Sequence, residues 1–369
     1  MIEKGRISAF QMGIMMYPTV LATALLMVPS ITAKHSERDL WLSPIWASSI
    51  GFLIVYIVYQ LNKLYPKESI VEYSEHILGR IPGKLIGFIY LVFYLHINGI
   101  IIREYGELIV STTLFQTPMV MVLGSMVLVC AFAVRGGVEV LGRCAQFFMP
   151  GVTILFLLLI VLLIPDLDPK NMFPMMEHGL KPSFLGSVVP QGWFSEFMLI
   201  SFLLPFLSDQ EKGMKWGMIS VVTVMLLMVL TNFAILFLFG GVTGALVYPV
   251  ITAARYISLA DFFEHLESIV MAIWVTSAFV KISVFYYALV LGTSQWLNLP
   301  NYRPIVFPVG FLLVLFSLWV APNLQELTHF LSTSGALYLI SIQTVIPLLL
   351  LFSSFAQKKA QQKKGKQKG

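Results

Sequence analysis

Charged residues are scarce in this chain of 369 amino acids. Asp, Glu, Lys and Arg together make up 12% of it, about half of the ~25% found in soluble domains. Hydrophobic residues make up 57%, and the mean hydropathy is +0.83. This balance excludes a soluble globular protein and indicates a polytopic membrane protein.

Cysteine and the common catalytic motifs are also nearly absent. The two cysteines, Cys130 and Cys144, lie in or beside apolar runs, so we expect free buried thiols. The sequence contains no phosphate-binding loop, GxGxxG, HExxH, GxSxG or Cys/His cluster. We therefore expect neither an enzyme nor an ATP-driven pump, and no metal or cofactor. The first apolar run leads into a full span, so we expect no cleaved signal peptide.

What the chain does contain is a series of apolar segments long enough to cross a bilayer. We predict ten transmembrane helices, at about 7–31, 41–64, 82–115, 118–134, 140–164, 188–207, 213–239, 266–291, 305–320 and 331–355. They form one transmembrane domain, 1–355, with one repeat at about 7–164 and a second at about 186–355. A disordered basic tail, 356–369, follows.

The placement of Lys and Arg predicts the orientation in the membrane. With the N-terminus in the cytoplasm, seventeen basic residues lie on the inner side and five on the outer side. Both termini are therefore predicted to be cytoplasmic. The lysine-rich tail is explained as a topology signal that contacts anionic lipid, and we expect no nucleic-acid binding.

The sixth apolar segment, 188–207, reads VVPQGWFSEFMLISFLLPFL. Pro190 removes a backbone donor, Gly192 weakens the helix, and Glu196 places a carboxyl group near mid-membrane. Such a segment is typical of an interrupted helix that lines a ligand site. The first segment also contains prolines and small residues. Two interrupted helices at matching positions favour a transporter core of five plus five helices in an inverted repeat.

Glu196 has two interpretations of equal weight. It is either a structural carboxyl that satisfies freed backbone amides, or the acceptor of a ligand amine and a proton-sensitive switch. Lys281 lies in the middle of the eighth segment, one turn after Ser277, and needs either a carboxylate partner or the neutral, deprotonated form at that depth. We hypothesise that its ammonium takes the place of a sodium ion between the first and eighth helices.

The third segment carries a polar stripe. His96, Arg103 and Glu107 share one helical face, and Glu104 is offset from it. An internal Arg–Glu pair that orients this helix is the favoured interpretation, because pairing within one helix lowers the cost of burial. A proton path or a carboxylate clamp is the alternative.

Three stretches resemble a known family. The run YPVITAARYISLADFFEHLESIVMAIWVTSAFVKISVFYYAL (248–289), with TALLMVP (23–29) and SEFMLISFLLP (195–205), is similar to the endospore germination permeases, the B subunits of nutrient germinant receptors. That family belongs to the amino acid–polyamine–organocation superfamily. The resemblance implies an all-α, LeuT-like fold with interrupted helices 1 and 6. It also implies a location in the spore inner membrane and association with A and C subunits.

We therefore predict a germinant receptor subunit that binds a small nutrient such as an amino acid. The predicted lining, between the first and sixth helices, consists of Thr19, Ala22, Thr23, Ala24, Gly192, Phe194, Ser195 and Glu196. Family members tend to have glycine where this chain has Ala22 and Ala24, which predicts a narrower pocket. A proton-coupled amino-acid symporter is the alternative, and a scaffold subunit with a vestigial site is a third possibility.

Overall fold

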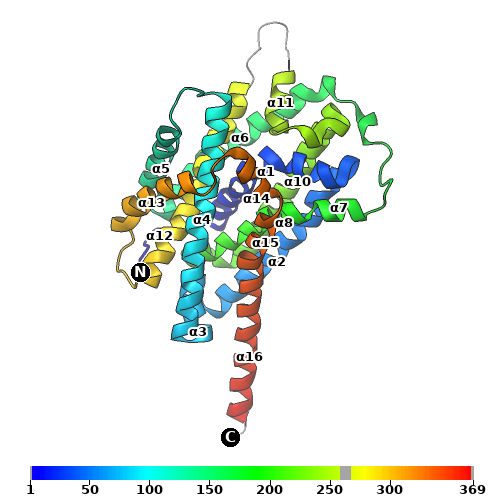
Figure 1. Ribbon diagram of the computed structural model, residues 1–369. Coiled ribbons are helices and arrows are strands. Elements are labelled where there is room, and N and C mark those ends of the chain that lie inside the picture. The colour runs from blue at the N-terminus through cyan, green and yellow to red at the C-terminus, as the bar shows by residue number, and fades with distance from the viewer. Residues whose placement is uncertain (1, 258–266, 367–369) are drawn as a thin grey trace.

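The structure is a computed structural model that describes residues 2–257 and 267–366, without the side chains of 267 and 360–366. Part of the segment that carries the family resemblance, 258–266, and the last three residues of the basic tail lie outside the described residues. The described chain folds into a bundle of helices (Figure 1).

The long helices of the bundle are α1 (Ala9–Ser36), α2 (Ser43–Leu64), α4 (Arg80–Thr112), α5 (Met119–Gly136), α6 (Val138–Leu163), α10 (Gly213–Phe239), α12 (Glu267–Trp296), α13 (Val306–Trp319) and α16 (Ile346–Lys366). Shorter helices connect or extend them: α3 (Ile70–Leu78), α7 (Lys181–Gly186), α8 (Val188–Ser195), α9 (Ile200–Leu203), α11 (Pro249–Tyr256), α14 (Leu324–Ser332) and α15 (Ser334–Ile340). The turns that matter below are the 3-10 helices η1 (Glu37–Leu42), η4 (Glu196–Leu199), η5 (Leu204–Phe206) and η7 (Gly240–Ala245), and the π-helical turn η9 (Ser341–Val345).

Eight helical stretches in the described chain are long and apolar enough to cross a membrane, or nine if the bent pair α13 and α14 counts as one. The first stretch, Ala9–Leu64, has 56 residues and contains α1, η1 and α2. A continuous helix of that length would measure ~84 Å, against ~30 Å of hydrocarbon. Since α1 and α2 are each long enough to span, the stretch is compatible with two spans. The total of ten stays a prediction.

The first and sixth spans differ in continuity. The sixth is interrupted as predicted, because α8 ends at Ser195 and continues as η4, α9 and η5. The first is not: α1 runs unbroken from Ala9 to Ser36 with Pro18 and Pro29 inside it, so the predicted interruption of helix 1 is wrong. A proline inside a helix frees one carbonyl, and Pro and Gly are tolerated in membrane helices whose neighbours satisfy the freed groups.

Helix α1 lies in the middle of the bundle, where it packs against α10, α12, α6 and α8 (Figure 1). Most of its residues from Met12 to Thr32 are buried, which fits a helix that is apolar on all sides. Helix α4 packs against α12, α13 and α5. The site described below therefore lies at the centre of the protein, where α1, α4, η4 and α12 meet.

The N-terminal segment is hydrogen-bonded to the end of the sixth span. Ile7 forms an isolated parallel β-bridge with Leu207, and the backbone amide of Ala9 donates to Asp209 Oδ1 at 2.7 Å. The carboxylate of Glu3 accepts from the backbone amide of Val138 at 3.1 Å and from the Tyr302 hydroxyl at 2.9 Å. These contacts link α1, the sixth span and α6 at one end of the bundle.

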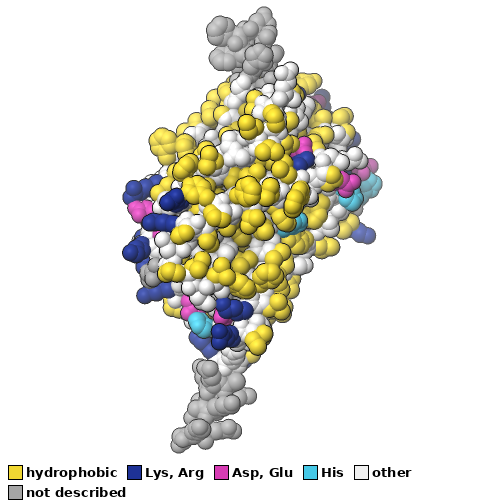
Figure 2. All heavy atoms as spheres, turned by 60° about the vertical axis from the view of Figure 1, so that its left-hand side comes forward, with side chains coloured by type: hydrophobic (Ala, Val, Ile, Leu, Met, Phe, Trp, Pro, Cys, Tyr) yellow, Lys and Arg dark blue, Asp and Glu magenta, His cyan; other side chains and the backbone are white. Residues whose placement is uncertain are grey.

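The outer surface is apolar over much of its area. Figure 2 shows hydrophobic side chains across the middle of the molecule, with Lys and Arg gathered toward one edge and the lower end. Large side chains such as Phe147 and Trp319 are about four-fifths exposed, at 80% and 78%. Such a surface suits contact with lipid. Helix α16 continues to Lys366, where the sequence analysis expects disorder, because Lys, Gln and Ala are all good helix formers.

Candidate functional site

An ion pair between Lys281 of α12 and Glu196 of η4 forms the centre of the candidate site. The Lys281 ammonium donates to both oxygens of the Glu196 carboxylate, at 2.8 and 3.0 Å. Lys281 is 0% exposed and Glu196 is 2% exposed. Removing one partner of such a buried pair leaves the other charge uncompensated, at a cost of roughly 3–5 kcal/mol. The pair thus couples the interrupted sixth span to the eighth.

Thr23 of α1 completes this cluster. Its hydroxyl oxygen accepts from Lys281 Nζ at 2.9 Å and from the indole nitrogen of Trp193 at 2.8 Å. Three spans therefore meet at one hydroxyl group: the first through Thr23, the sixth through Trp193 and the eighth through Lys281. We call Thr23, Trp193, Glu196 and Lys281 the central cluster.

The local sequence of the sixth span explains how Glu196 is positioned. Gly192 allows α8 to approach α15 closely, because a Cβ there would lie 3.1 Å from the Ala336 Cα. The Ser195 hydroxyl donates to the Gly192 carbonyl at 2.6 Å, where α8 tightens into η4. A 3-10 turn rotates successive side chains differently from an α-helix, which directs Glu196 toward α12.

The predicted lining residues divide into two groups. Thr23 and Glu196 belong to the central cluster, and the Ala22 carbonyl accepts from the indole nitrogen of Trp274 at 2.6 Å. The other side chains make different contacts. The Thr19 hydroxyl donates to the Met15 carbonyl of its own helix, and Ala24 is buried in the core.

The two predicted residues directly before Glu196 also face elsewhere. A Cβ on Gly51 of α2 would lie 2.9 Å from the Phe194 ring, so this ring packs on α2. The Ser195 hydroxyl accepts from Gln343 of η9 at 3.2 Å. Neither of these two contacts is with the central cluster. The Ser277 hydroxyl donates to the Ile273 carbonyl, and Ser277 lines the small apolar cavity described below.

The polar stripe of α4 contains the predicted internal pair. Arg103 binds Glu107 at 2.7 Å, and its guanidinium lies 3.4 Å from the carbonyls of Leu318 and Pro322. His96 meets the Tyr338 hydroxyl at 3.1 Å. Glu104 is 3% exposed, and its Oε1 has no hydrogen-bond partner among the described residues.

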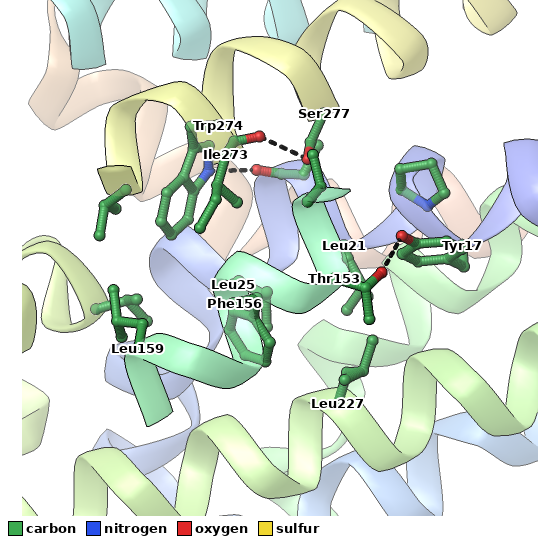
Figure 3. A pocket seen from close by; sticks show the side chains of 15 residues that line it. Tyr17, Leu21, Leu25, Thr153, Phe156, Leu159, Leu227, Ile273, Trp274 and Ser277 are labelled. Atoms are coloured by element: carbon green, nitrogen blue, oxygen red, sulfur yellow. Dashed lines mark hydrogen bonds between the residues drawn. The ribbon is translucent and has the colours of Figure 1, made fainter. Parts of the chain in front are cut away.

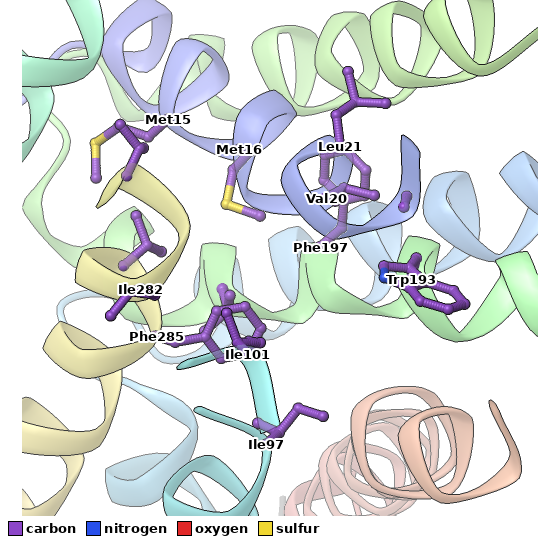
Figure 4. Close-up of a cluster of buried hydrophobic side chains, with 14 of the residues drawn as sticks. Met15, Met16, Val20, Leu21, Ile97, Ile101, Trp193, Phe197, Ile282 and Phe285 are labelled. Carbon is purple, nitrogen blue, oxygen red and sulfur yellow. The ribbon is translucent and has the colours of Figure 1, made fainter. Parts of the chain in front are cut away.

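Apolar side chains lie near the central cluster, where the Lys281 Nζ is 5.5 Å from the centre of the Phe285 ring. Figure 4 shows Met16, Ile97, Ile101, Phe197 and Phe285 gathered between α1, α4, η4 and α12. Each of the five is at most 2% exposed. Access for a ligand in this conformation would require these side chains to move.

A small apolar cavity lies beside α1, bounded by α6, α10 and α12 (Figure 3). Its volume is about 40 Å³, and Ala22, Trp274 and Ser277 are among its lining residues. Trp274 is a contact residue that the sequence analysis missed. The only indication of its role in the sequence is its position one turn before Ser277. That indication is weak, because aromatic residues in membrane helices usually serve packing.

A larger cavity, about 530 Å³ in volume, lies beside the C-terminal half of α1. It is lined by the C-terminal half of α1, by η7 and by α14, and its lining includes Met27, Ser30, Lys34 and His329. Met27 follows Thr23 by four residues, which is about 6 Å along a helix. The cavity therefore ends one helical turn from the central cluster.

A bundle of apolar helices around a buried charged cluster at a helix interruption defines a membrane protein of the transporter-fold class. The structure of a Na⁺-coupled sialic acid symporter, solved in its substrate-bound outward-open state, matches it with a TM-score of 0.65 and 12% identity. The match covers 92% of this chain and 80% of the symporter. The predicted all-α, LeuT-like architecture is thereby confirmed.

The family follows from sequence. A family model described as "Spore germination protein" matches residues 6–325, so the chain belongs to this family. Spore germination protein KB of Bacillus subtilis is 28% identical, with 98% of each chain covered. Spore germination protein YndE of the same organism is 23% identical, with 97% of this chain and 98% of the relative covered. The predicted resemblance is confirmed, and the chain is an integral membrane protein with permease character.

Proposed function

We propose that this chain is the B subunit of a nutrient germinant receptor, and that it binds a small nutrient such as an amino acid at the central cluster. The single observation that carries the proposal is the Glu196–Lys281 pair, which lies at the interruption of the sixth span in a transporter fold. A structure that only had to fold would gain as much from apolar residues at these two positions.

The ligand would enter from the cavity beside α14 and displace the apolar side chains around the cluster. Its carboxylate would then meet the Lys281 ammonium, and its amine would meet Glu196. Both ions would exchange one partner for another without becoming uncompensated. Binding changes the receptor because the sealed and opened arrangements have different affinities for the ligand.

The subunit would act in the spore inner membrane, with both termini cytoplasmic, together with A- and C-type subunits. Germination of the spore would be the response to nutrient binding. Family membership supports this assignment, and the excess of basic residues in the segments predicted to be cytoplasmic supports the orientation.

The test is the response of spores to nutrients when Glu196→Gln replaces the wild-type chain in a strain that lacks its other germinant receptors. We expect the nutrient response to fall strongly while the variant still inserts into the membrane, as measured by immunoblot of membrane fractions. The matched control is Glu139→Gln, since Glu139 is an exposed partner of Arg143 on α6. A variant with wild-type sensitivity would refute the role of Glu196.

The symporter fold favours a second candidate function, proton-coupled transport of an amino acid. Uptake of labelled amino acids into liposomes that contain the purified chain distinguishes the two. Accumulation driven by a proton gradient identifies a symporter, and saturable binding without accumulation identifies a sensor.

A further inference from the structure

Glu104 of α4 is a buried carboxyl group with an oxygen that lacks a hydrogen-bond partner among the described residues. It is 3% exposed, and its Oε1 makes no hydrogen bond to any described residue. Its neighbour Arg103 does not compensate it, because the guanidinium is already bound to Glu107 at 2.7 Å. An isolated carboxylate in such a place is very costly, so the group must be neutral or paired.

Two charged groups of the central cluster act on Glu104 from other elements of the structure. Glu104 interacts electrostatically with Lys281 of α12 and Glu196 of η4, and also with Tyr248, which directly precedes α11. Helix α3 carries Glu72, Glu75 and His76, but it packs on α4 at Gly83, about 30 Å along the helix from Glu104. The remaining helices around α4 add little charge. Helix α13 has no ionisable side chain, Cys130 and the exposed Arg135 are those of α5, and Glu326 and His329 of α14 are exposed.

One ammonium group thus serves two carboxyl groups. Lys281 compensates Glu196 in the observed arrangement, which leaves Glu104 with the surplus negative charge. The apolar side chains around this region are closely packed, as Ile101 on the same helix shows with 2% exposure. A proton needs no cavity, whereas a metal ion or an organic cation needs both room and several oxygen ligands.

We propose that Glu104 is a proton-binding site, and that Glu104 and Glu196 are alternative partners of the Lys281 ammonium. In the observed arrangement Glu196 is the carboxylate and Glu104 carries the proton. In the other arrangement Lys281 pairs with Glu104, which releases its proton, and Glu196 takes up a proton. Two carboxyls, one ammonium and one proton are present in both, so the net charge in the membrane stays zero.

This inference concerns the ligand-free protein and does not depend on the identity of the nutrient. It assigns a function to Glu104, which is not needed for the structural pair of Arg103 and Glu107 on α4. If the proposed function fails because no nutrient binds, the two protonation arrangements are still measurable in the purified chain.

The first experiment is infrared spectroscopy of the purified full-length protein in lipid nanodiscs at neutral pH. Protonated carboxyl groups give a C=O stretching band that is separate from the carboxylate bands. We expect Glu104→Gln to remove one such band and Glu107→Gln to leave it unchanged, since Glu107 is bound to Arg103. A Glu104→Gln spectrum with the wild-type protonated band would overturn the proton site.

The second experiment tests the exchange of partners. In Glu196→Gln, Lys281 should turn to Glu104, so the same band should disappear although Glu104 is still present. Persistence of the band in this variant would overturn the exchange. In the double variant Glu104→Gln/Glu196→Gln, Lys281 has no carboxylate, and the melting temperature should fall by more than the sum of the two single changes. Additive shifts would also overturn it, and the two single variants decide the matter if the double variant does not fold.

Discussion

The indole nitrogen of Trp193 lies 2.8 Å from the Thr23 hydroxyl oxygen, 170 residues earlier in the chain. The same oxygen accepts from Lys281 at 2.9 Å. This one hydroxyl group therefore aligns the interrupted sixth span and the ammonium group of the eighth against the continuous first helix. Thr23 therefore belongs to the site together with the charged pair.

Thr23→Val should be clearly destabilising. The isosteric valine leaves the Trp193 indole N–H and one N–H of Lys281 without an acceptor, and each unsatisfied buried donor costs about 1–3 kcal/mol. Thr23→Ser keeps the hydroxyl and should cost less. The measurement is the melting temperature of the purified protein in detergent. Thr19→Val is the matched control, because the Thr19 hydroxyl bonds only to its own helix. Equal shifts for Thr19→Val and Thr23→Val would contradict the prediction.

Stability and ligand response should be independent of sodium. The Lys281 ammonium contacts α1 through Thr23 and the sixth span through Glu196, so it supplies the positive charge that a cation between these helices would supply. Replacing sodium by potassium or by a large organic cation at constant ionic strength should leave the melting temperature unchanged. A sodium-specific increase, with or without an amino-acid ligand, would show that Lys281 does not play this part.

How far the sequence predicts this site can be judged from Glu196 and Lys281. The depth of each residue in an apolar segment predicts that it is important. Their pairing could not be predicted, because the two residues are 85 positions apart on different spans. Ser195 and Phe194 were predicted as lining because they adjoin Glu196. They contact η9 and α2 instead, since the rotation of α8 about its axis is set by packing and not by an apolar run.

The continuity of α1 shows a related limit. Two prolines and two alanines predicted an interruption in the first span, yet Trp274 and Lys281 of α12 bind the Ala22 carbonyl and the Thr23 hydroxyl of an unbroken helix. Whether a proline breaks a buried helix depends on the helices that pack against it. The helices that pack on α1 come from distant parts of the sequence. The order of apolar segments, by contrast, is a local property, which explains why the fold class was predictable.

A pH dependence is expected from Glu72 of α3, which lies outside the spans. Burial raises the pKa of its carboxyl group above the usual value, against the opposing effect of the Ser69 backbone amide. The folded protein therefore binds the proton of Glu72 more tightly than the unfolded chain does. The corresponding stability is present at low pH and is lost as the pH rises through the raised pKa.

Glu72→Gln should remove this contribution, so the melting temperature of the variant should fall less between mildly acidic and neutral pH than that of the wild type. Glutamine is also suited to the capping box that Glu72 forms with Ser69, so α3 should stay intact. Glu68→Gln is the comparison, because Glu68 directly precedes Ser69, the N-cap residue of α3. An unchanged pH slope in Glu72→Gln would assign the dependence to other groups.

The packing of α3 on α4 rests on Gly83, and Gly83→Ala should disrupt it. A Cβ at this position would lie 2.3 Å from the Glu75 Cα and 2.6 Å from the Glu75 nitrogen. These are backbone atoms that cannot move aside singly, so the two helices would have to separate, at a cost of about 1–3 kcal/mol for overpacking. Gly124→Ala in α5 is the matched control, because nothing lies within 4 Å of its added methyl group. Alanine also favours helix over glycine, by ~1 kcal/mol in a helix interior. We therefore expect the melting temperature to fall in Gly83→Ala and to stay the same or rise in Gly124→Ala, and a fall of similar size in both would show that α3 and α4 do not depend on this close approach.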